Sequence, residues 1–270
     1  MTADQFNEPP VPRILMIAGS DSGGGAGIQA DIRTVTMLGG HAMTAVTAVT
    51  AQNTLGVQAV HAIPTDMVIA QIDSVLDDLG ADAIKIGMIG SAETAAVVAE
   101  RLGGLDCPIV FDPVMVATSG AALADAPTIA AFEALMRVAS VVTPNLPELE
   151  ALGGEEVVLA HGCHLLAKGG HAEGSWITDR VLAPGGREIA RLEAKKFDSD
   201  GTHGTGCTLA SALATGLGAG LSIEDAFSQA VRFVRLAILS APGFGGGHGP
   251  IGHTLGHNPY QQLAGLGDGR

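Results

Sequence analysis

The apolar run Arg13-Ile-Leu-Met-Ile-Ala18 leads directly into the glycine-rich stretch Gly19-Ser-Asp-Ser-Gly-Gly-Gly-Ala-Gly27, and a helical pattern follows over 26–38. A short continuous apolar run that ends in a glycine-rich turn and a helix is typical of a buried parallel strand that feeds a crossover helix. The stretch therefore predicts a strand over 13–18, a turn and a helix over 26–38.

The same alternation continues along the chain. We predict strands over 42–51, 57–63, 83–87, 108–112 and 140–143, and helices over 65–79, 92–102 and 128–139. Such alternation predicts right-handed βαβ units and a mostly parallel sheet with helices on both faces. Three further strands, joined by Gly-Gly turns, would form an antiparallel edge over 164–168, 176–182 and 188–196, and the helices 206–217 and 223–239 would close the domain. The predicted fold is a three-layer α/β/α sandwich.

Length and composition favour one domain. The chain has 270 residues, of which 47% are hydrophobic, and this is enough to fill one large α/β core. Residues 1–12 carry neither a basic start nor an apolar core, so we interpret them as a flexible tail rather than a signal peptide. We expect a single domain over 13–254 and a mobile tail over 255–270.

Charge and cysteine content restrict the partners. The net charge of −14 argues against binding of nucleic acid or anionic membranes, and no apolar run reaches membrane-spanning length. The three cysteines have no CxxC or zinc-ligand spacing, which suits a reducing cytoplasm. We expect a cytoplasmic protein in which any phosphate ligand is held by local features.

One such feature is Gly201-Thr-His-Gly-Thr-Gly-Cys207, which precedes an unbroken helical run. A helix start offers free N–H groups and the positive end of the helix dipole, and glycines let a phosphate approach closely. This favours a phosphate site at Gly204, Thr205 and Gly206, with Cys207 within reach. The alternative is an ordinary glycine-rich helix start with a small buried cysteine.

Several polar residues follow the predicted parallel strands directly, at the edge where α/β sheets bind ligands. Asn145 and Glu148 lie three residues apart in Thr143-Pro-Asn-Leu-Pro-Glu148, and Asp112 ends another strand. Mg²⁺ prefers carboxylates and other oxygen donors, so Asn145 and Glu148 could bind it directly or through water, with Asp112 as a third donor; Asp112 and Glu148 are the candidate metal ligands. The same spacing serves equally well a helix N-terminus in which Asn145 and Glu148 form a capping box.

Lys168 and His203 are the remaining candidate site residues. Lys168 ends an apolar strand, which would place its ammonium group on a nucleotide phosphate, although a solvated surface lysine fits as well. His203 is expected to order its loop by hydrogen bonding rather than to act as a base. The chain has no GxxxxGK[ST], HExxH or GxSxG motif.

Seven ordered motifs carry a family resemblance over about residues 13–253. They are Ala18-Gly-Ser-Asp-Ser-Gly-Gly-Gly-Ala-Gly-Ile-Gln-Ala-Asp31, Thr50-Ala-Gln-Asn-Thr-Leu-Gly-Val57, Lys85-Ile-Gly-Met88, Asp112-Pro-Val-Met115, Thr143-Pro-Asn-Leu-Pro-Glu148, Lys168-Gly-Gly-His171 and His203-Gly-Thr-Gly-Cys207. Together they resemble the hydroxymethylpyrimidine/phosphomethylpyrimidine kinases of thiamine biosynthesis, a branch of the ribokinase superfamily.

The resemblance implies a ribokinase-like fold, a homodimer, and phosphorylation of 4-amino-5-hydroxymethyl-2-methylpyrimidine and then of its monophosphate, with ATP and Mg²⁺. It implies that the pyrimidine is held by Gly19, Asp31, Gln52, Met88 and Val114, and that ATP is held by Lys168, Asn145 and Thr205. Related kinases carry an aspartate base where this chain has Cys207. A thiol at a helix start can have a lowered pKa, so Cys207 is either a base or a residue of the phosphate pocket.

Departures from the family pattern leave alternatives open. Thr118 stands where many relatives have a lysine, and the segment 149–164 is short, which would truncate the usual helix there. A pyridoxal or pyridoxine kinase on the same scaffold, or a pyrimidine sensor without turnover, are the competing functions. The segment 57–63 is a candidate lid element or a plain edge strand.

Overall fold

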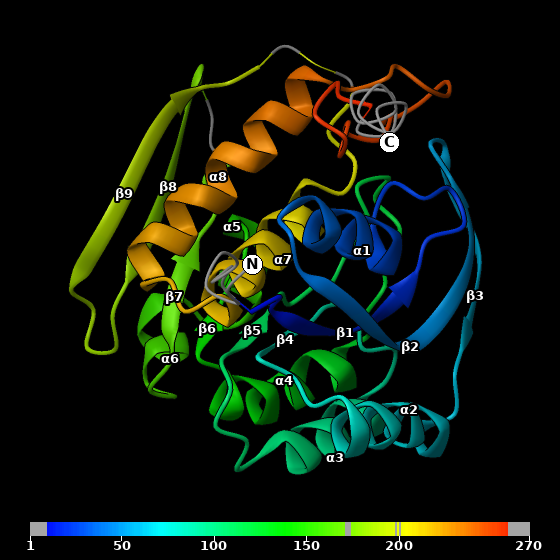
Figure 1. The fold of residues 1–270 in the computed structure, drawn as a ribbon, viewed down its shortest axis with the longest axis vertical. Coiled ribbons are helices and arrows are strands. Elements are labelled where there is room, and N and C mark those ends of the chain that lie inside the picture. Colours follow the sequence, from blue (N-terminus) through cyan, green and yellow to red (C-terminus); the bar gives the residue numbers. More distant parts are fainter. Residues whose placement is uncertain (1–9, 171–173, 198, 200, 259–270) are drawn as a thin grey trace, which may run out of the picture.

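A nine-stranded sheet runs through the part of the chain that the structure, a computed structural model, describes, residues 10–170, 174–197, 199 and 201–258. Its strand order is β3-β2-β1-β4-β5-β6-β7-β8-β9 (Figure 1). The strands are β1 (Arg13–Ser20), β2 (His41–Asn53), β3 (Gly56–Ala62), β4 (Ala83–Ile86), β5 (Ile109–Phe111), β6 (Val141–Val142), β7 (His164–Ala167), β8 (Trp176–Leu182) and β9 (Glu188–Lys195).

The strands from β2 to β7 in that order pair in parallel, whereas β3, β8 and β9 pair antiparallel to their neighbours. The mostly parallel sheet and its antiparallel edge at β8 and β9 are therefore confirmed. A second antiparallel edge lies at β3, whose residues 58–62 are all exposed, so the segment 57–63 forms an edge strand.

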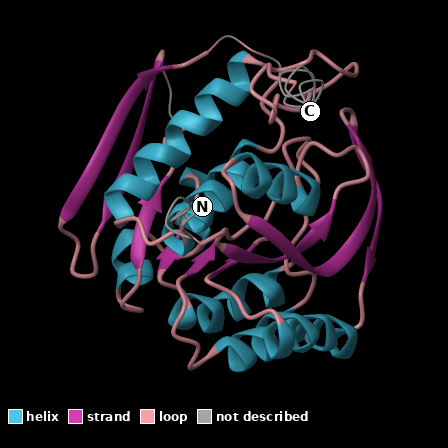
Figure 2. Ribbon diagram, in the orientation of Figure 1, coloured by secondary structure: helices cyan, strands magenta, loops and turns pink. Residues whose placement is uncertain are grey.

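Helices cover both faces of the sheet (Figures 1 and 2). They are α1 (Gly27–Met37), α2 (Thr65–Asp78), α3 (Ala92–Leu102), α4 (Ala126–Val138), α5 (Leu146–Ala151), α6 (Glu155–Leu159), α7 (Thr205–Gly218) and α8 (Ile223–Leu239). Strand β1 separates two cores because its side chains alternate. Leu15 and Ile17 pack with α2, α3 and α4, whereas Ile14 and Met16 pack with α1, α7 and α8. This confirms the three-layer sandwich.

Several boundaries differ from the predicted ones. The strands expected over 108–112 and 140–143 are only three and two residues long, Ile109–Phe111 and Val141–Val142. Helix α4 begins at Ala126 rather than at 128, since the side chain of Asp125 caps it. The short segment 149–164 still contains α6, which follows Gly153 and Gly154, both at φ +94.

No helix of the described residues combines the length and the apolar character that crossing a membrane requires. The predicted tails reach outside the described part, which leaves out residues 1–9 and 259–270. The boundaries at 12 and 254 stay predictions.

His253 attaches the C-terminal segment to α7. Its Nε2 atom lies 2.9 Å from Oγ1 of Thr208, and both side chains are buried. Burial lowers the pKa of His253 to about 4, and the charge of Arg33 adds to the effect. The folded protein therefore keeps this imidazole neutral.

We predict that acid weakens the fold through His253. The unfolded chain binds a proton at this residue below its ordinary pKa of 6.5, whereas the folded chain binds it only near pH 4. Above pH 6.5 the residue does not lower the free energy of unfolding. As the pH falls from 6.5 to 4, protonation of the unfolded chain lowers that free energy, by about 2 kcal/mol at pH 5. Urea unfolding at pH 7.5 and 5 measures the loss. His253→Gln, which does not titrate, should lose about 2 kcal/mol less than the natural chain, and an equal loss would contradict the assignment.

Candidate active site

The start of α7 is a glycine turn that no side chain caps, and uncapped helix starts can bind anions. Gly204 is the N-cap residue, so no side chain caps the helix, and the first turn contains no acidic residue. Gly204 has φ +88, and a Cβ atom there would lie 1.9 Å from the carbonyl oxygen of Gly25. The two glycine-rich turns therefore pack directly on one another, and both need glycine to do so.

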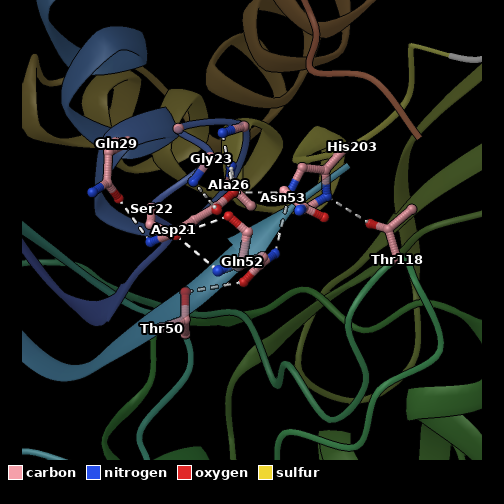
Figure 3. A network of polar contacts seen from close by, with 12 residues as sticks. Asp21, Ser22, Gly23, Ala26, Gln29, Thr50, Gln52, Asn53, Thr118 and His203 are labelled. Atoms are coloured by element: carbon pink, nitrogen blue, oxygen red, sulfur yellow. Dashed lines mark hydrogen bonds and ion pairs between the residues drawn. The ribbon is translucent and has the colours of Figure 1, made fainter. Parts of the chain in front are cut away.

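The amino-terminal turn does not share this openness. Asp21 accepts the N–H group of Gly23 with Oδ1 at 2.8 Å, and the N–H groups of Gly25 and Ala26 with Oδ2 at 3.0 and 2.8 Å (Figure 3). A carboxylate of the chain itself thus takes the place that an anion would occupy. The turn before α7 is the one left available for phosphate.

His203 joins three segments of the site. Its Nε2 atom lies 2.9 Å from Oδ2 of Asp21 and 3.3 Å from Nε2 of Gln52, and its Nδ1 atom lies 3.2 Å from Oγ1 of Thr118 (Figure 3). Burial would raise the pKa of Asp21, but the bonds from His203 and from the backbone lower it. His203 orders its loop by hydrogen bonding, as predicted, and Thr118 is one of its partners.

Lys168 joins two buried carboxylates at the ligand edge. Its Nζ atom lies 2.8 Å from Oδ1 of Asp112 and 3.8 Å from Oε2 of Glu148. Burial would lower the pKa of Lys168, but these two carboxylates raise it. A Cβ atom on Gly206 would lie 3.4 Å from the same Nζ, so the ammonium group faces the open turn of α7. The structure thus brings these predicted residues together.

Asn145 and Glu148 form the capping box that the sequence left as an alternative. Oδ1 of Asn145 accepts the N–H group of Glu148 at 2.9 Å, and Oε2 of Glu148 accepts that of Asn145 at 2.8 Å. Burial raises the pKa of Glu148, and the charge of Asp112 adds to the effect. The amide oxygen of Asn145 is therefore engaged within the helix start.

Asp112 and Glu148 suit a magnesium ion whose other ligands are water and substrate phosphates. Both carboxylates are buried and share Lys168 as a partner. The described residues contain no cluster of three or more histidine, cysteine or acidic side chains that could hold a metal alone. Mg²⁺ is commonly held by one or two carboxylates together with water and substrate phosphates, which matches this donor set.

Cys207 does not show the lowered pKa that a thiol at a helix start can have. Burial raises the pKa of its thiol to about 11, although the charge of Lys85 and a hydrogen bond from the backbone of Gly27 oppose the rise. The helix start does not compensate for the loss of water around the sulfur. The thiol is therefore neutral near pH 7 in this structure.

The residues that the resemblance implies as pyrimidine contacts differ in burial and in their partners. A Cβ atom on Gly19 would lie 3.0 Å from Sδ of Met88, so these two are in contact. Gln52, half-buried at the end of β2, is bonded to Thr50 and approaches His203. Val114 is half-buried in the loop after Asp112. Asp31 is fully buried in an ion pair with Lys85.

Sequence reasoning missed Asp21, Lys85 and Ser211. An aspartate two residues before a run of glycines is typical of a side chain that accepts backbone N–H groups, which was a readable signal for Asp21. A lysine inside an apolar parallel strand must be buried and paired, which was a signal for Lys85. The predicted motif at 168–171 ends at His171, which lies outside the described residues.

Comparisons with known proteins identify the family of this chain. A family model described as phosphomethylpyrimidine kinase matches residues 21–252. The hydroxymethylpyrimidine/phosphomethylpyrimidine kinase of Streptomyces coelicolor is 46% identical over 91% of this chain and 96% of its own. A thiamine biosynthesis bifunctional protein of Geobacter sulfurreducens is 42% identical over 91% of this chain, which spans only 53% of that longer protein.

Solved structures share the fold. A pyridoxal kinase from Staphylococcus aureus in complex with AMP-PCP and pyridoxal has a TM-score of 0.81 at 30% identity, covering 91% of this chain and 94% of its own. A phosphomethylpyrimidine kinase from Clostridium difficile has a TM-score of 0.72 at 34% identity, covering 84% of this chain and 99% of its own.

The contact between the two glycine turns predicts a large difference between two matched substitutions. Gly204→Ala and Gly120→Ala both place alanine at a positive φ, +88 and +87, but nothing lies within 4 Å of a Cβ on Gly120. We expect Gly120→Ala to cost about 1 kcal/mol of backbone strain. Gly204→Ala should cost at least about 3 kcal/mol, because the new Cβ also meets Gly25. Urea unfolding checks both, and equal losses would mean that the turns do not need this contact.

Proposed function

The chain belongs to the phosphomethylpyrimidine kinase family, and from this we propose that it transfers the γ-phosphoryl group of ATP to 4-amino-5-hydroxymethyl-2-methylpyrimidine, and then to the resulting monophosphate. Each transfer joins a substrate oxygen to phosphorus and releases ADP. The observation that carries the proposal is that Lys168 and Asp112 both lie against Gly206 in the open turn of α7, with Glu148 beside Lys168.

Phosphoryl transfer places its main demands on position and charge. The transferred group carries negative charge on its outer oxygens, and donors fixed in advance stabilise that charge. The turn from Gly204 to Gly206 supplies backbone N–H groups, and Lys168 supplies an ammonium group beside it. A protein of net charge −14 needs such a local positive site to hold ATP.

Asp112 and Glu148 are the proposed magnesium-binding residues. When bound, Mg²⁺ would neutralise charge on the phosphates. In the structure Lys168 offsets both carboxylates, which keeps this acidic pair buried. Thr205, the first residue of α7, and Asn145, the N-cap of α5, complete the proposed nucleotide edge.

The pyrimidine would lie against Gly19, Gln52, Met88 and Val114. An amide such as that of Gln52 offers a donor beside an acceptor, which complements the amino group and the ring nitrogen of an aminopyrimidine. The contact of Gly19 with the sulfur of Met88 forms an apolar surface suited to a flat ring.

Cys207 is better suited to the phosphate pocket than to the role of base. Burial raises the pKa of its thiol to about 11, so no thiolate is available at neutral pH. In a loose transition state the acceptor hydroxyl needs little help from a base, and positioning carries most of the rate. The small neutral side chain would leave room for the transferring group.

Pyridoxal is a second candidate acceptor. The specific observation is the similarity to the Staphylococcus aureus pyridoxal kinase, whose structure holds pyridoxal and AMP-PCP. Both substrates are flat heteroaromatic rings with a hydroxymethyl group. We also propose that the protein acts in the cytoplasm, since Cys107, Cys163 and Cys207 are all free thiols. The family resemblance supports a homodimer.

The proposal predicts ADP release with hydroxymethylpyrimidine and with its monophosphate in the presence of Mg-ATP. Mass spectrometry identifies the monophosphate and the diphosphate as products. Turnover of pyridoxal alone would replace the pyrimidine assignment with the pyridoxal one. Stabilisation by the pyrimidine without release of ADP would indicate a sensor.

Two substitutions separate transfer from ring binding. Cys207→Ala should lower kcat about tenfold and leave the KM for the pyrimidine nearly unchanged, because the pocket keeps its backbone donors. A loss of about 100-fold or more would restore the role of base. Gln52→Ala should raise that KM about tenfold, the effect of one or two lost hydrogen bonds. Steady-state kinetics checks both, and unchanged kinetics in both variants would contradict the site.

A further inference from the structure

Ser22 holds the backbone of Gln52 at the point where β2 leaves its regular pairing. The register of β2 with β3 shifts between Ala51 and Gln52. The hydroxyl of Ser22 accepts the N–H group of Gln52 and donates to its carbonyl oxygen, both at 2.8 Å (Figure 3). One side chain thus satisfies both polar backbone groups of Gln52, which fixes the root of its side chain.

The side-chain amide of Gln52 lies between two polar partners. One end is 3.3 Å from Oγ1 of Thr50, and the other end is 3.3 Å from Nε2 of His203 (Figure 3). The oxygen and the NH2 group of an amide have nearly the same shape but opposite hydrogen-bonding roles. The partners therefore decide which end of the amide is the oxygen.

Asp21 requires a hydrogen on Nε2 of His203. Its Oδ2 atom lies 2.9 Å from that nitrogen and also accepts the N–H groups of Gly25 and Ala26. Although burial would raise the pKa of Asp21, its bonds to His203 and to the backbone lower it, so the carboxylate is ionised and can only accept. Nε2 therefore donates, whether the imidazole is neutral or charged, and the end of Gln52 that faces it must be the oxygen.

Thr50 requires the same orientation independently. Its one hydroxyl hydrogen is donated to the carbonyl oxygen of Ser20 at 2.9 Å. Toward Gln52 this hydroxyl can then only accept, so the NH2 group must face it. Both partners thus favour a half-turn of the amide from the arrangement drawn in Figure 3, which moves no other group. The opposite orientation sets donor against donor at His203.

We propose that Ser22, Thr50 and His203 are positioning residues that determine specificity: they fix the amide of Gln52 in one orientation, and the site therefore selects a 4-aminopyrimidine over a 4-oxopyrimidine of the same shape. The identity of the ligand rests on the proposed function. The orientation of the amide rests on the contacts alone, and this makes the two separable by experiment.

The fixed amide reads the order of donor and acceptor on the ring. His203 and Thr50 use one hydrogen-bonding position at each end, which leaves one oxygen lone pair and one N–H for a ligand. The lone pair accepts from the 4-amino group, and the N–H donates to the neighbouring ring nitrogen. In the 4-oxo compound that nitrogen carries a hydrogen and the exocyclic group is an oxygen, so both contacts are mismatched.

The ring cannot restore these contacts by turning over. In the proposed function its hydroxymethyl group points toward the turn of α7, which fixes the direction of the ring. A glutamine that rotates freely would accept both compounds, because a half-turn exchanges its donor and its acceptor. Discrimination therefore depends on what holds Gln52, and not on Gln52 alone.

The test measures dissociation constants for 4-amino-5-hydroxymethyl-2-methylpyrimidine and for its 4-oxo analogue by isothermal titration calorimetry without ATP. The ratio of the two constants is the readout, because a general loosening of the site weakens both ligands and cancels. Reversal of the amide loses two hydrogen bonds, so we expect the unsubstituted chain to prefer the amino compound about 30-fold or more.

The matched variants are His203→Gln and His203→Met, which have similar length and shape and differ in the donor. A glutamine N–H group can replace Nε2–H on Asp21, whereas methionine offers none. The backbone of His203 donates to the carbonyl oxygen of Gly249 at 3.1 Å and forms a bridge with Pro250, contacts that neither substitution removes. We expect His203→Gln to keep most of the preference and His203→Met to lower it to about threefold.

A second pair of variants covers the case in which His203→Met does not fold. Thr50→Val removes the other partner of the amide and should lower the preference to about tenfold. Thr215→Val is its control, because Thr215, near the C-terminal end of α7, also donates a buried hydroxyl to a backbone carbonyl, that of Ser211 at 2.7 Å. This control should keep the full preference.

NMR of the protein labelled with ¹⁵N-histidine tests the orientation without a ligand. Long-range ¹H–¹⁵N correlations show which ring nitrogen carries a hydrogen, and the signals of His203 are those that His203→Gln loses. We expect a hydrogen on Nε2 of His203. A hydrogen on Nδ1 alone would overturn the proposal, since Nε2 would then accept from the NH2 group of Gln52.

Equal ratios in His203→Gln and His203→Met, or a ratio near one in the unsubstituted chain, would also overturn the proposal, even if the chain releases ADP with the pyrimidine. Selective binding of the amino compound without release of ADP from Mg-ATP would reject the proposed function and leave the fixed orientation of Gln52 intact. Binding of neither compound would overturn both.

Discussion

The ion pair of Lys168 with Asp112 holds together the edge of the sheet on which the rest of the site depends. The two atoms lie 2.8 Å apart, and their residues follow different parallel strands, β7 and β5. Because parallel strands end at one edge, groups distant in the chain meet there and can share charge. The lysine offsets Asp112 and Glu148, which allows two carboxylates to be buried in a chain of net charge −14.

Close packing of the backbone supplies the second requirement. No side chain caps the turn before α7, while the turn before α1 has its N–H groups bonded to Asp21. The bond of Asp21 to His203 and the approach of Gly204 to Gly25 fix one turn on the other. Two similar glycine-rich motifs thus differ: Asp21 fills the turn before α1, whereas no side chain fills the turn before α7.

The sequence predicted the layers, the antiparallel edge and the residues around Lys168, because apolar periodicity and strand ends are local signals. Other features depended on groups far apart in the chain. The sequence left open whether the thiol of Cys207 has a lowered pKa, and only the fold shows that burial raises it. Asp31 matched a family motif, yet its partner Lys85 lies 54 residues away. The capping box at Asn145 was visible, but only the fold showed that it is formed.

The central claim is that the transferred phosphoryl group lies on the turn of α7, beside Lys168. The most direct measurement is a crystal structure with a non-hydrolysable ATP analogue, Mg²⁺ and the pyrimidine. We expect the terminal phosphate to lie within hydrogen-bond distance of the backbone N–H groups of Gly206 and Cys207 and of Nζ of Lys168. A phosphate bound instead by the turn from Gly23 to Ala26, with Asp21 displaced from it, would contradict the account.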